Sequence, residues 1–278
     1  MRTLQNKNHS SRILSLGLGL LLATSSLIGC ASDDDDSNTT AVHKLEPDLE
    51  TQLALSSAPA HVRADAGVYL HDATAGLVEA TQSKNGYNCF VARTDIQAMS
   101  LGNVEYREDI LIPICFDAVG SEHILPMWLH AEAERAKGTP AAEMFAGLDS
   151  LANAAPRAGV APMLSPFMRT FVGPGQVGNM NYPHYMYYAP GITNEDISAI
   201  PFGPVHTWVD NAAGFGGKQA YFIQPMGVVE KAAINAEHAE LLQKLCASRE
   251  DGAFCLDMDT INAGIRQQLE ASMAALGQ

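Results

Sequence analysis

The sequence predicts an α+β fold, in which helices pack on an antiparallel sheet of about five to seven strands and two helices close the chain. Three observations lead to this prediction. Segments of strand length dominate the chain after residue 66, alanine-rich helical segments follow residue 125, and amphipathic helical segments fill the end of the chain. A run of strands with helices between and after it is typical of the α+β class.

The first elements are a helix and three strands. A helical pattern covers residues 45–58, and Pro59 ends it. Strand patterns follow at residues 67–72, 77–82 and 87–93. Asn85-Gly86 lies between the second and third strands and is the strongest short hairpin signal in the chain, so these two strands are expected to pair.

The middle of the chain changes from strand to helix. Residues 110–116 are an apolar run of strand length, which places Cys115 beside the strand of Cys89. Residues 126–137 and 140–153 are alanine-rich and helical, and Pro140 suits a first helical position. Residues 156–179 are rich in Pro and Gly and are expected to be largely loop.

The end of the chain contains two more strands and two helices. Residues 182–189 predict an aromatic strand and residues 220–225 a last strand, while Thr193 between them is expected to cap a short helix. Residues 228–245 predict one helix. A final helix has an apolar stripe that consists of Ile261, Ile265, Leu269, Met273 and Leu276.

The N-terminus has the composition of an export signal. Arg2, Lys7 and Arg12 accompany an apolar run at residues 13–22, and no acidic residue precedes Cys30. A positive region, an apolar region and a cleavage site in this order are typical of a signal peptide. The alternative, a transmembrane anchor, is disfavoured because the run is well short of the roughly 20 apolar residues that a spanning helix needs.

The stretch Leu27-Ile28-Gly29-Cys30 resembles the lipobox of bacterial lipoproteins. The resemblance implies that residues 1–29 are a lipoprotein signal peptide, and that Cys30 becomes the acylated first residue of the mature chain. In lipoproteins of the enteric kind, an Asp after the Cys favours the inner membrane, but this chain has Ala31. The resemblance therefore implies a lipid-anchored protein of the cell envelope, at the outer membrane rather than the inner one, whose domain faces the periplasm or the cell surface.

Residues 30–44 predict an acidic tether, and residues 45–278 a single α+β domain. Four aspartates at residues 33–36 repel one another into an extended linker, whereas a calcium site would need about six oxygens from a folded loop. Removal of residues 1–29 leaves 14 Lys and Arg against 31 Asp and Glu, a net charge of −17. Such a surface repels nucleic acid and anionic lipid, so the acyl anchor is expected to hold the protein to its membrane.

The chain has five cysteines, an odd number that lipidation of Cys30 explains. The other four are expected to pair by proximity, Cys89 with Cys115 and Cys246 with Cys255, because an exported protein reaches an oxidising compartment. The alternative, a four-cysteine zinc site, is disfavoured by the lack of a C-x-x-C pair.

The candidate ligand or metal site lies around an aromatic segment at residues 179–190. The residues proposed for it are His184, Tyr188, Glu195, Asp196 and His206. In the functional interpretation, His184, His206 and one of the two carboxylates converge on a metal or a polar ligand. In the alternative interpretation, the aromatic residues form the sheet core and His184 is a buried histidine with satisfied hydrogen bonds. The lack of a tight ligand spacing favours the second interpretation.

Other motifs are weaker. His130 and Glu134 share one face of a predicted helix but lack a third ligand for a metal. The string at residues 173–178 matches G-x-G-x-x-G but leads into a strand, and Gly216-Gly217-Lys218 lacks the flanking residues of a phosphate loop. Both glycine motifs are therefore interpreted as turns.

No recognised catalytic motif is present, which favours a binding or envelope-associated module over an enzyme. No cofactor is predicted for such a module. The alternative is a metal-assisted hydrolase that would use His184, His206 and a carboxylate from Glu195 or Asp196, with zinc as its metal. The membrane is the only partner that the sequence indicates, through the lipid anchor.

Overall fold

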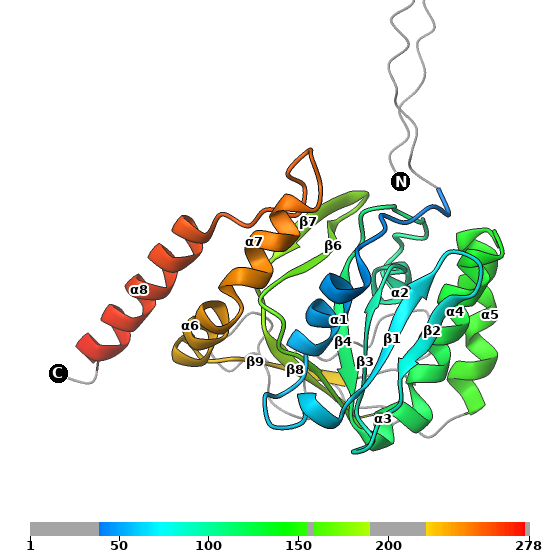
Figure 1. Ribbon diagram of the computed structural model, residues 1–278, viewed down its shortest axis with the longest axis horizontal. Helices are drawn as coiled ribbons and strands as arrows, with labels where there is room; N and C mark the ends of the chain where they lie inside the picture. The colour runs from blue at the N-terminus through cyan, green and yellow to red at the C-terminus, as the bar shows by residue number, and fades with distance from the viewer. Residues whose placement is uncertain (1–38, 155–157, 190–220, 276–278) are drawn as a thin grey trace, which may run out of the picture. The chain divides into compact units, whose positions relative to one another are not determined.

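The computed structural model describes residues 39–154, 158–189 and 221–275, and over these residues the predicted α+β class is confirmed (Figure 1). The helices are α1 (Pro47–Ser56), η1 (Arg63–Asp65), α2 (Ile96–Ser100), α3 (Ala118–His123), α4 (Leu125–Ala136), α5 (Ala141–Ala154), α6 (Val228–Glu237), α7 (Ala239–Ala247) and α8 (Met258–Ala275). The strands are β1 (Gly67–Asp72), β2 (Gly76–Thr81), β3 (Asn88–Ala92), β4 (Ile112–Phe116), β5 (Val160–Met163), β6 (Met168–Gly173), β7 (Gln176–Met180), β8 (His184–Tyr188) and β9 (Tyr221–Pro225).

The described strands form three sheets rather than one. A four-stranded sheet has the order β2-β1-β3-β4, a three-stranded sheet has the order β5-β8-β9, and β6 pairs with β7. All neighbouring pairs are antiparallel except β1 and β3, which run parallel. The total therefore exceeds the five to seven strands that we predicted.

The predicted hairpin at Asn85-Gly86 is wrong, because β2 and β3 are not paired. The Asn85 side chain donates to the carbonyl oxygen of Val62 at 2.8 Å and accepts from the N–H of Tyr87 at 3.0 Å. The bond to Val62 attaches the turn to the segment before β1. Strand β3 pairs with the edge of β1 opposite to β2. Gly86 does have the positive φ of a turn residue, 83°. The pattern therefore predicts the turn correctly but not the strands with which β3 pairs.

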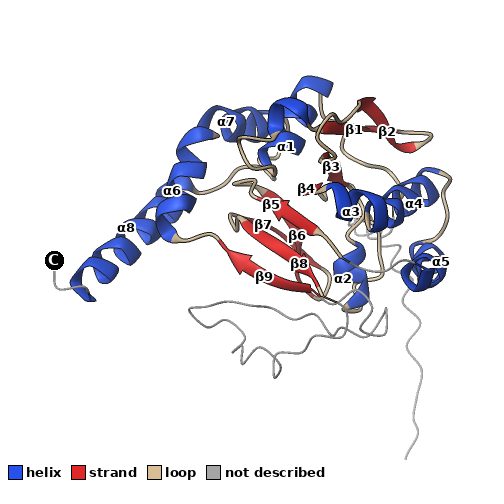
Figure 2. Ribbon diagram, turned by 90° about the horizontal axis from the view of Figure 1, so that it is seen from below, coloured by secondary structure: helices blue, strands red, loops and turns tan. Residues whose placement is uncertain are grey.

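The four-stranded sheet is covered by helices on both faces. Phe90 of β3 and Phe116 of β4 face α4 and pack with Trp128, whereas Cys89 and Cys115 on the opposite face pack with α1 and α7. In Figure 2, β3 and β4 lie between α1 on one side and α3 and α4 on the other. Strands buried on both faces are mostly apolar, as β4 and all of β3 after Asn88 are.

The prediction of loop for residues 156–179 is wrong, because this segment contains β5, β6 and β7. Part of its Gly and Pro content forms a turn: Gly173-Pro174-Gly175 joins β6 to β7, and Gly175 has φ 66°. The interpretation of this G-x-G-x-x-G string as a turn is therefore confirmed. A bridge between Leu111 and Arg169 links β6 to the segment before β4.

The C-terminal part has three helices instead of two. The helix predicted at residues 228–245 is divided at His238, whose backbone angles (φ −104°, ψ 19°) leave the helical region. No Gly or Pro occurs at this break, so no local feature of the sequence marks it. The stripe on α8 is only partly used, since Ile265 is buried and Met273 is exposed.

Both predicted disulfide bonds form in the structure. Cys89 is joined to Cys115, its direct neighbour across β3 and β4, and Cys246 is joined to Cys255 across the loop after α7. The first bond lies in the fully buried core on the α1 face of the sheet.

The segment before α1 is fixed by a buried arginine, which we call the Arg135 clamp. Arg135 of α4 is 1% exposed and donates to the backbone carbonyl oxygens of Thr40 at 3.0 Å and Ala41 at 2.5 Å. The same guanidinium donates to the carbonyl oxygens of Arg107, at 3.0 Å, and Arg93. A planar group with five donors suits such a cluster of acceptors.

The clamp belongs to a larger buried charge cluster. Arg93 forms an ion pair with Glu50 at 3.0 Å, and Glu132 accepts hydrogen bonds from the N–H groups of Arg93 and Thr94 at 2.7 Å each. Burial raises the pKa of Glu132, and the nearby Arg135 charge opposes the rise. Because its charged groups interact with one another, we infer that this cluster holds the fold together and is not a binding site.

Candidate functional site

Strand β8 positions His184, a residue predicted for the ligand or metal site, at the wall of a cavity. Its side chains alternate, so that His184, Met186 and Tyr188 are buried while Tyr185 and Tyr187 are only half-buried. This alternation confirms the two faces that the sequence predicted. The ring of Tyr187 stacks on Phe222 of the neighbouring β9, which secures the outer face of the sheet.

A cavity of about 350 Å³ lies where α2, the β6–β7 hairpin and the β5-β8-β9 sheet meet. We call it the His184 cavity. Most of its walls are apolar, and four methionines contribute to them. Its lining residues are Asp95, Gln97, Ala98, Leu101, Ile112, Met163, Met168, Thr170, Phe171, Val172, Met180, Tyr182, His184, Met186, Tyr221 and Ile223.

Asp95 joins two walls of the cavity. Its buried carboxylate accepts from the N–H of Ala98 at 2.9 Å, which caps α2, and from the hydroxyl of Thr170 on β6. Burial raises the pKa of Asp95, and the Thr170 hydrogen bond opposes the rise. Because the carboxylate oxygens are engaged by the protein itself, we assign Asp95 to positioning α2 against β6.

His184 brings a neutral imidazole to this cavity. The side chain is 4% exposed, and burial lowers its pKa from 6.5 to about 4. Nδ1 lies 2.6 Å from the carbonyl oxygen of Tyr182, and because a carbonyl can only accept, we assign the proton to Nδ1. Nε2 then carries a lone pair, for which the described residues provide no hydrogen-bond partner.

Tyr182 is the second polar group of the cavity. Its ring lies 5.0 Å from the His184 ring, centroid to centroid, and burial raises its pKa to about 12. The hydroxyl group is buried, and the described part of the chain offers it no hydrogen-bond partner. The phenol therefore stays protonated at neutral pH. It adds one donor to a cavity that already has the Nε2 acceptor.

Of the other residues predicted for the ligand or metal site, the structure describes Tyr188, which does not line the cavity. Tyr188 packs in the core against Phe116 and Tyr221, with ring centroids 6.3 and 5.5 Å away. Glu195, Asp196 and His206 lie outside the described residues, as do the turn at Gly216-Gly217-Lys218 and the predicted cap at Thr193. Within the described ranges, no three His, Cys, Asp or Glu side chains are grouped so as to hold a metal ion. The metal site therefore stays a prediction.

His130 and Glu134 are also accounted for without a metal. Glu134 accepts hydrogen bonds from Lys137 at 2.7 Å and from the hydroxyl of Thr139 at 2.8 Å, and these bonds lower its pKa. The carboxylate thus stabilises the end of α4, in agreement with its interpretation as surface decoration.

The sequence did not reveal the methionines, Asp95, Thr170 or Tyr182 as site residues. Met168 and Thr170 are two residues apart on β6 and so share one face, but the Pro and Gly content of that segment predicts a loop. Asp95 stands directly before α2, where an N-cap signal was available. No local pattern in the sequence indicates that β6 and the start of α2 meet in the fold.

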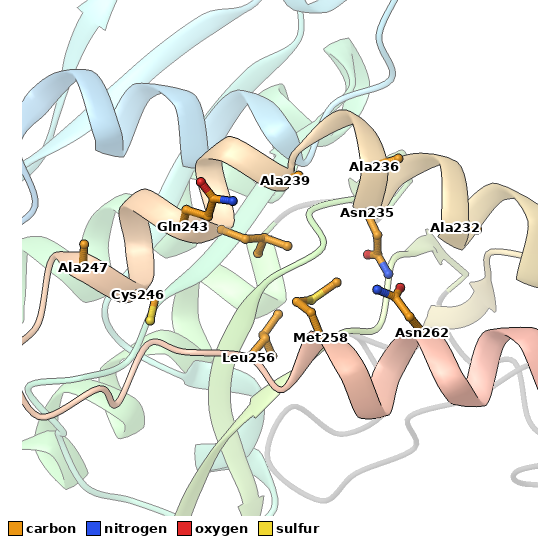
Figure 3. Close-up of a pocket in the computed structure, with 11 residues that line it drawn as sticks. Ala232, Asn235, Ala236, Ala239, Gln243, Cys246, Ala247, Leu256, Met258 and Asn262 are labelled. Carbon is orange, nitrogen blue, oxygen red and sulfur yellow. The ribbon is translucent and has the colours of Figure 1, made fainter.

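A second and larger groove, of about 570 Å³, lies between α6, α7 and α8. Small side chains widen it, among them Ala232, Ala236 and Ala239. Figure 3 shows Asn235 and Asn262 pointing toward each other from facing helices. Asn235 is satisfied by Asn181, whose amide donates to it at 2.8 Å. The lining contains no titratable group, because Cys246 is bridged, so the groove offers no acid-base chemistry.

Comparisons of the chain with protein families, with curated proteins and with solved structures found no match. None of the described helices is long and apolar enough to cross a membrane. We therefore infer the function from the geometry of the described residues.

Proposed function

We propose that this chain is a bacterial lipoprotein, anchored through Cys30, whose domain binds a small apolar molecule in the His184 cavity. The observation that carries the proposal is the buried imidazole of His184, which lines a cavity whose other walls are mainly apolar. Small-molecule sites commonly combine apolar walls with a few polar groups that orient the ligand.

The cavity restricts the size of the ligand. Its volume of about 350 Å³ is near the lower end of the range for ligand sites, about 300 to 1,000 Å³. This volume suits a molecule of one or two rings or a short branched chain. Methionine side chains are flexible and polarizable, so the four in the walls would adapt to ligands of different shape.

The polar groups restrict the chemistry of the ligand. A neutral His184 has an acceptor to offer, and a protonated Tyr182 has a donor. A ligand with a hydroxyl group can use both, because a hydroxyl donates and accepts. A charged ligand is disfavoured, since the apolar walls would remove its hydration without an opposite charge to replace it.

The test compares 1-naphthol with 1-methylnaphthalene, which differ in one hydroxyl group. We expect the wild-type protein to bind 1-naphthol about fivefold more tightly, as one net hydrogen bond of about 1 kcal/mol predicts. His184→Phe keeps an aromatic ring but removes the acceptor, so the preference should fall, while the Tyr182 donor remains. His130→Phe on α4 is the matched control and should retain it. Equal binding of the two probes by wild-type protein, or an undiminished preference in His184→Phe, would contradict the proposal.

The anchor has a separate test. Cys30→Ser should prevent acylation and cleavage, so the variant should keep its signal peptide and accumulate at the size of the precursor. A Cys30→Ser protein that remains in the membrane at the mature size would show that Cys30 is not the anchor. Binding of 1-naphthol by the domain does not depend on this result.

A further inference from the structure

Two exposed apolar side chains line the His184 cavity, and a third belongs to the loop that follows one of them. Leu101 is 58% exposed, Val104 is 37% exposed and Val172 is 54% exposed. Leu101 and Val172 also line the cavity, so they form part of its rim. We call these three residues the rim patch.

The rim patch is assembled by two segments that are distant in the sequence. The N–H of Gly175 in the β6–β7 turn donates to the side-chain oxygen of Asn103 at 2.9 Å. This bond places the hairpin turn beside the loop after α2, which brings Val172 and Val104 to one region. Other large apolar side chains exposed in the described chain are isolated on separate elements, as is common on protein surfaces.

The domain begins next to the same loop. His43 donates from its backbone N–H to the carbonyl oxygen of Glu108 at 2.7 Å, and Arg135 joins the carbonyl oxygens of Ala41 and Arg107. Arg107 is only three residues from Val104 in the sequence. Figure 1 shows the start of the described chain near the β6–β7 hairpin and the loop after α2.

The chain between the anchor and the clamp is short. Nine residues, 30–38, separate the clamped segment from the start of the proposed mature protein. At a maximum of about 3.6 Å per residue, they cannot span more than about 32 Å. A domain attached to a bilayer at this point keeps the clamped segment, and the loop beside it, within about that distance of the anchor.

We propose that the rim patch is a membrane-docking surface: Leu101, Val104 and Val172 insert among the headgroups of the leaflet that holds the acyl chains, and the His184 cavity opens toward that leaflet. This inference rests on the lipid anchor of the proposed function. It also names the source of the ligand, an uncharged apolar molecule dissolved in the membrane. Because the mature chain has a net charge of −17, the surface should dock on zwitterionic lipid better than on anionic lipid.

The test uses the lipidated full-length mature protein in phosphatidylcholine vesicles, with one environment-sensitive fluorophore on an introduced cysteine. Leu101→Cys and Val172→Cys report on the rim patch. Val229→Cys on α6, where the native side chain is 62% exposed, is the matched control. The introduced thiol is the only free one, since Cys30 would be acylated and the other four cysteines are bridged. Variants are used only if their thermal unfolding matches that of the parent protein.

We expect nitroxide-labelled lipid to quench the probes at positions 101 and 172 by at least half and to leave the probe at position 229 unchanged. Replacing half of the lipid with phosphatidylglycerol should weaken this quenching at low salt. Equal quenching at all three positions in protein that floats with the vesicles would overturn the docking surface alone. Protein that does not float would overturn the lipid anchor and the docking surface with it. A change of the probes at 101 and 172 without vesicles, with a rise in molecular mass, would show that a second copy covers the patch and would also overturn the inference.

Discussion

Replacement of Arg135 tests whether the segment before α1 is held as the structure indicates. In Arg135→Met the side chain still fills space, but the guanidinium donors to Thr40, Ala41, Arg93 and Arg107 are lost. The same change leaves the buried Glu132 without a neighbouring positive charge that now lowers its pKa. The substitution therefore removes one side of a buried, charge-assisted hydrogen-bond cluster.

The expected cost follows from these contacts. A hydrogen bond to a charged group contributes about 1.5 to 3 kcal/mol, but the bonds of one guanidinium are not additive. Loss of one partner from a buried charged group costs about 3 to 5 kcal/mol. We therefore expect Arg135→Met to lower the free energy of unfolding by about 4 kcal/mol. Arg135→Lys retains the charge with fewer donors and should cost about half as much.

Urea unfolding and hydrogen exchange measure these effects. The midpoint of unfolding should fall in the order wild type, Arg135→Lys, Arg135→Met, and the amide of His43 should exchange faster in both variants. Arg266→Met on the exposed side of α8 is the control and should remain within about 0.5 kcal/mol of wild type. If Arg135→Met lowers the free energy of unfolding by less than about 1 kcal/mol, the clamp does not stabilise the domain.

Two further predictions concern pH and backbone shape. The folded state lowers the pKa of His184 to about 4 from its ordinary 6.5, so the unfolded chain binds this proton more readily between these values. The free energy of unfolding should therefore fall by about 3 kcal/mol from this group as the pH drops from 6.5 through 4, and the fall should be smaller by that amount in His184→Phe. A pH dependence that is the same in both proteins would refute the burial effect. Gly76 and Gly175 both have positive φ, but a Cβ at Gly76 would lie 2.6 Å from the backbone of α4, whereas one at Gly175 would meet open space. Gly76→Ala should therefore lower the melting temperature clearly more than Gly175→Ala, and equal shifts would show that the β1–β2 turn does not pack on α4 as described.

Elements with a strong local pattern were predictable from the sequence. The two-residue alternation along β8 and the helical spacing of α4 each depend on burial of one face, which the sequence records directly. The pairing of Cys89 with Cys115 followed because two predicted strands each carried one cysteine. These predictions needed only local periodicity or short-range proximity.

The partners of strands and the walls of the cavity were not predictable in this way. Asn85-Gly86 specifies a turn, but the bond from Asn85 to Val62 decides which strand β3 joins. The Pro and Gly content of residues 156–179 obscured three strands, because those residues mark the turns between strands as well as loops. The hydrogen bond between Asp95 and Thr170 joins residues that are 75 positions apart, and no local pattern encodes it.

The Arg135 clamp also sets an order of events during synthesis of the chain. Arg135 lies 94 residues after Ala41, so a chain that emerges from its N-terminus cannot close the clamp until α4 has followed. In a lipoprotein, the enzymes that acylate the cysteine and cleave the signal would therefore meet the start of the chain before it is fastened to the domain. Modification and folding would then be separated in time.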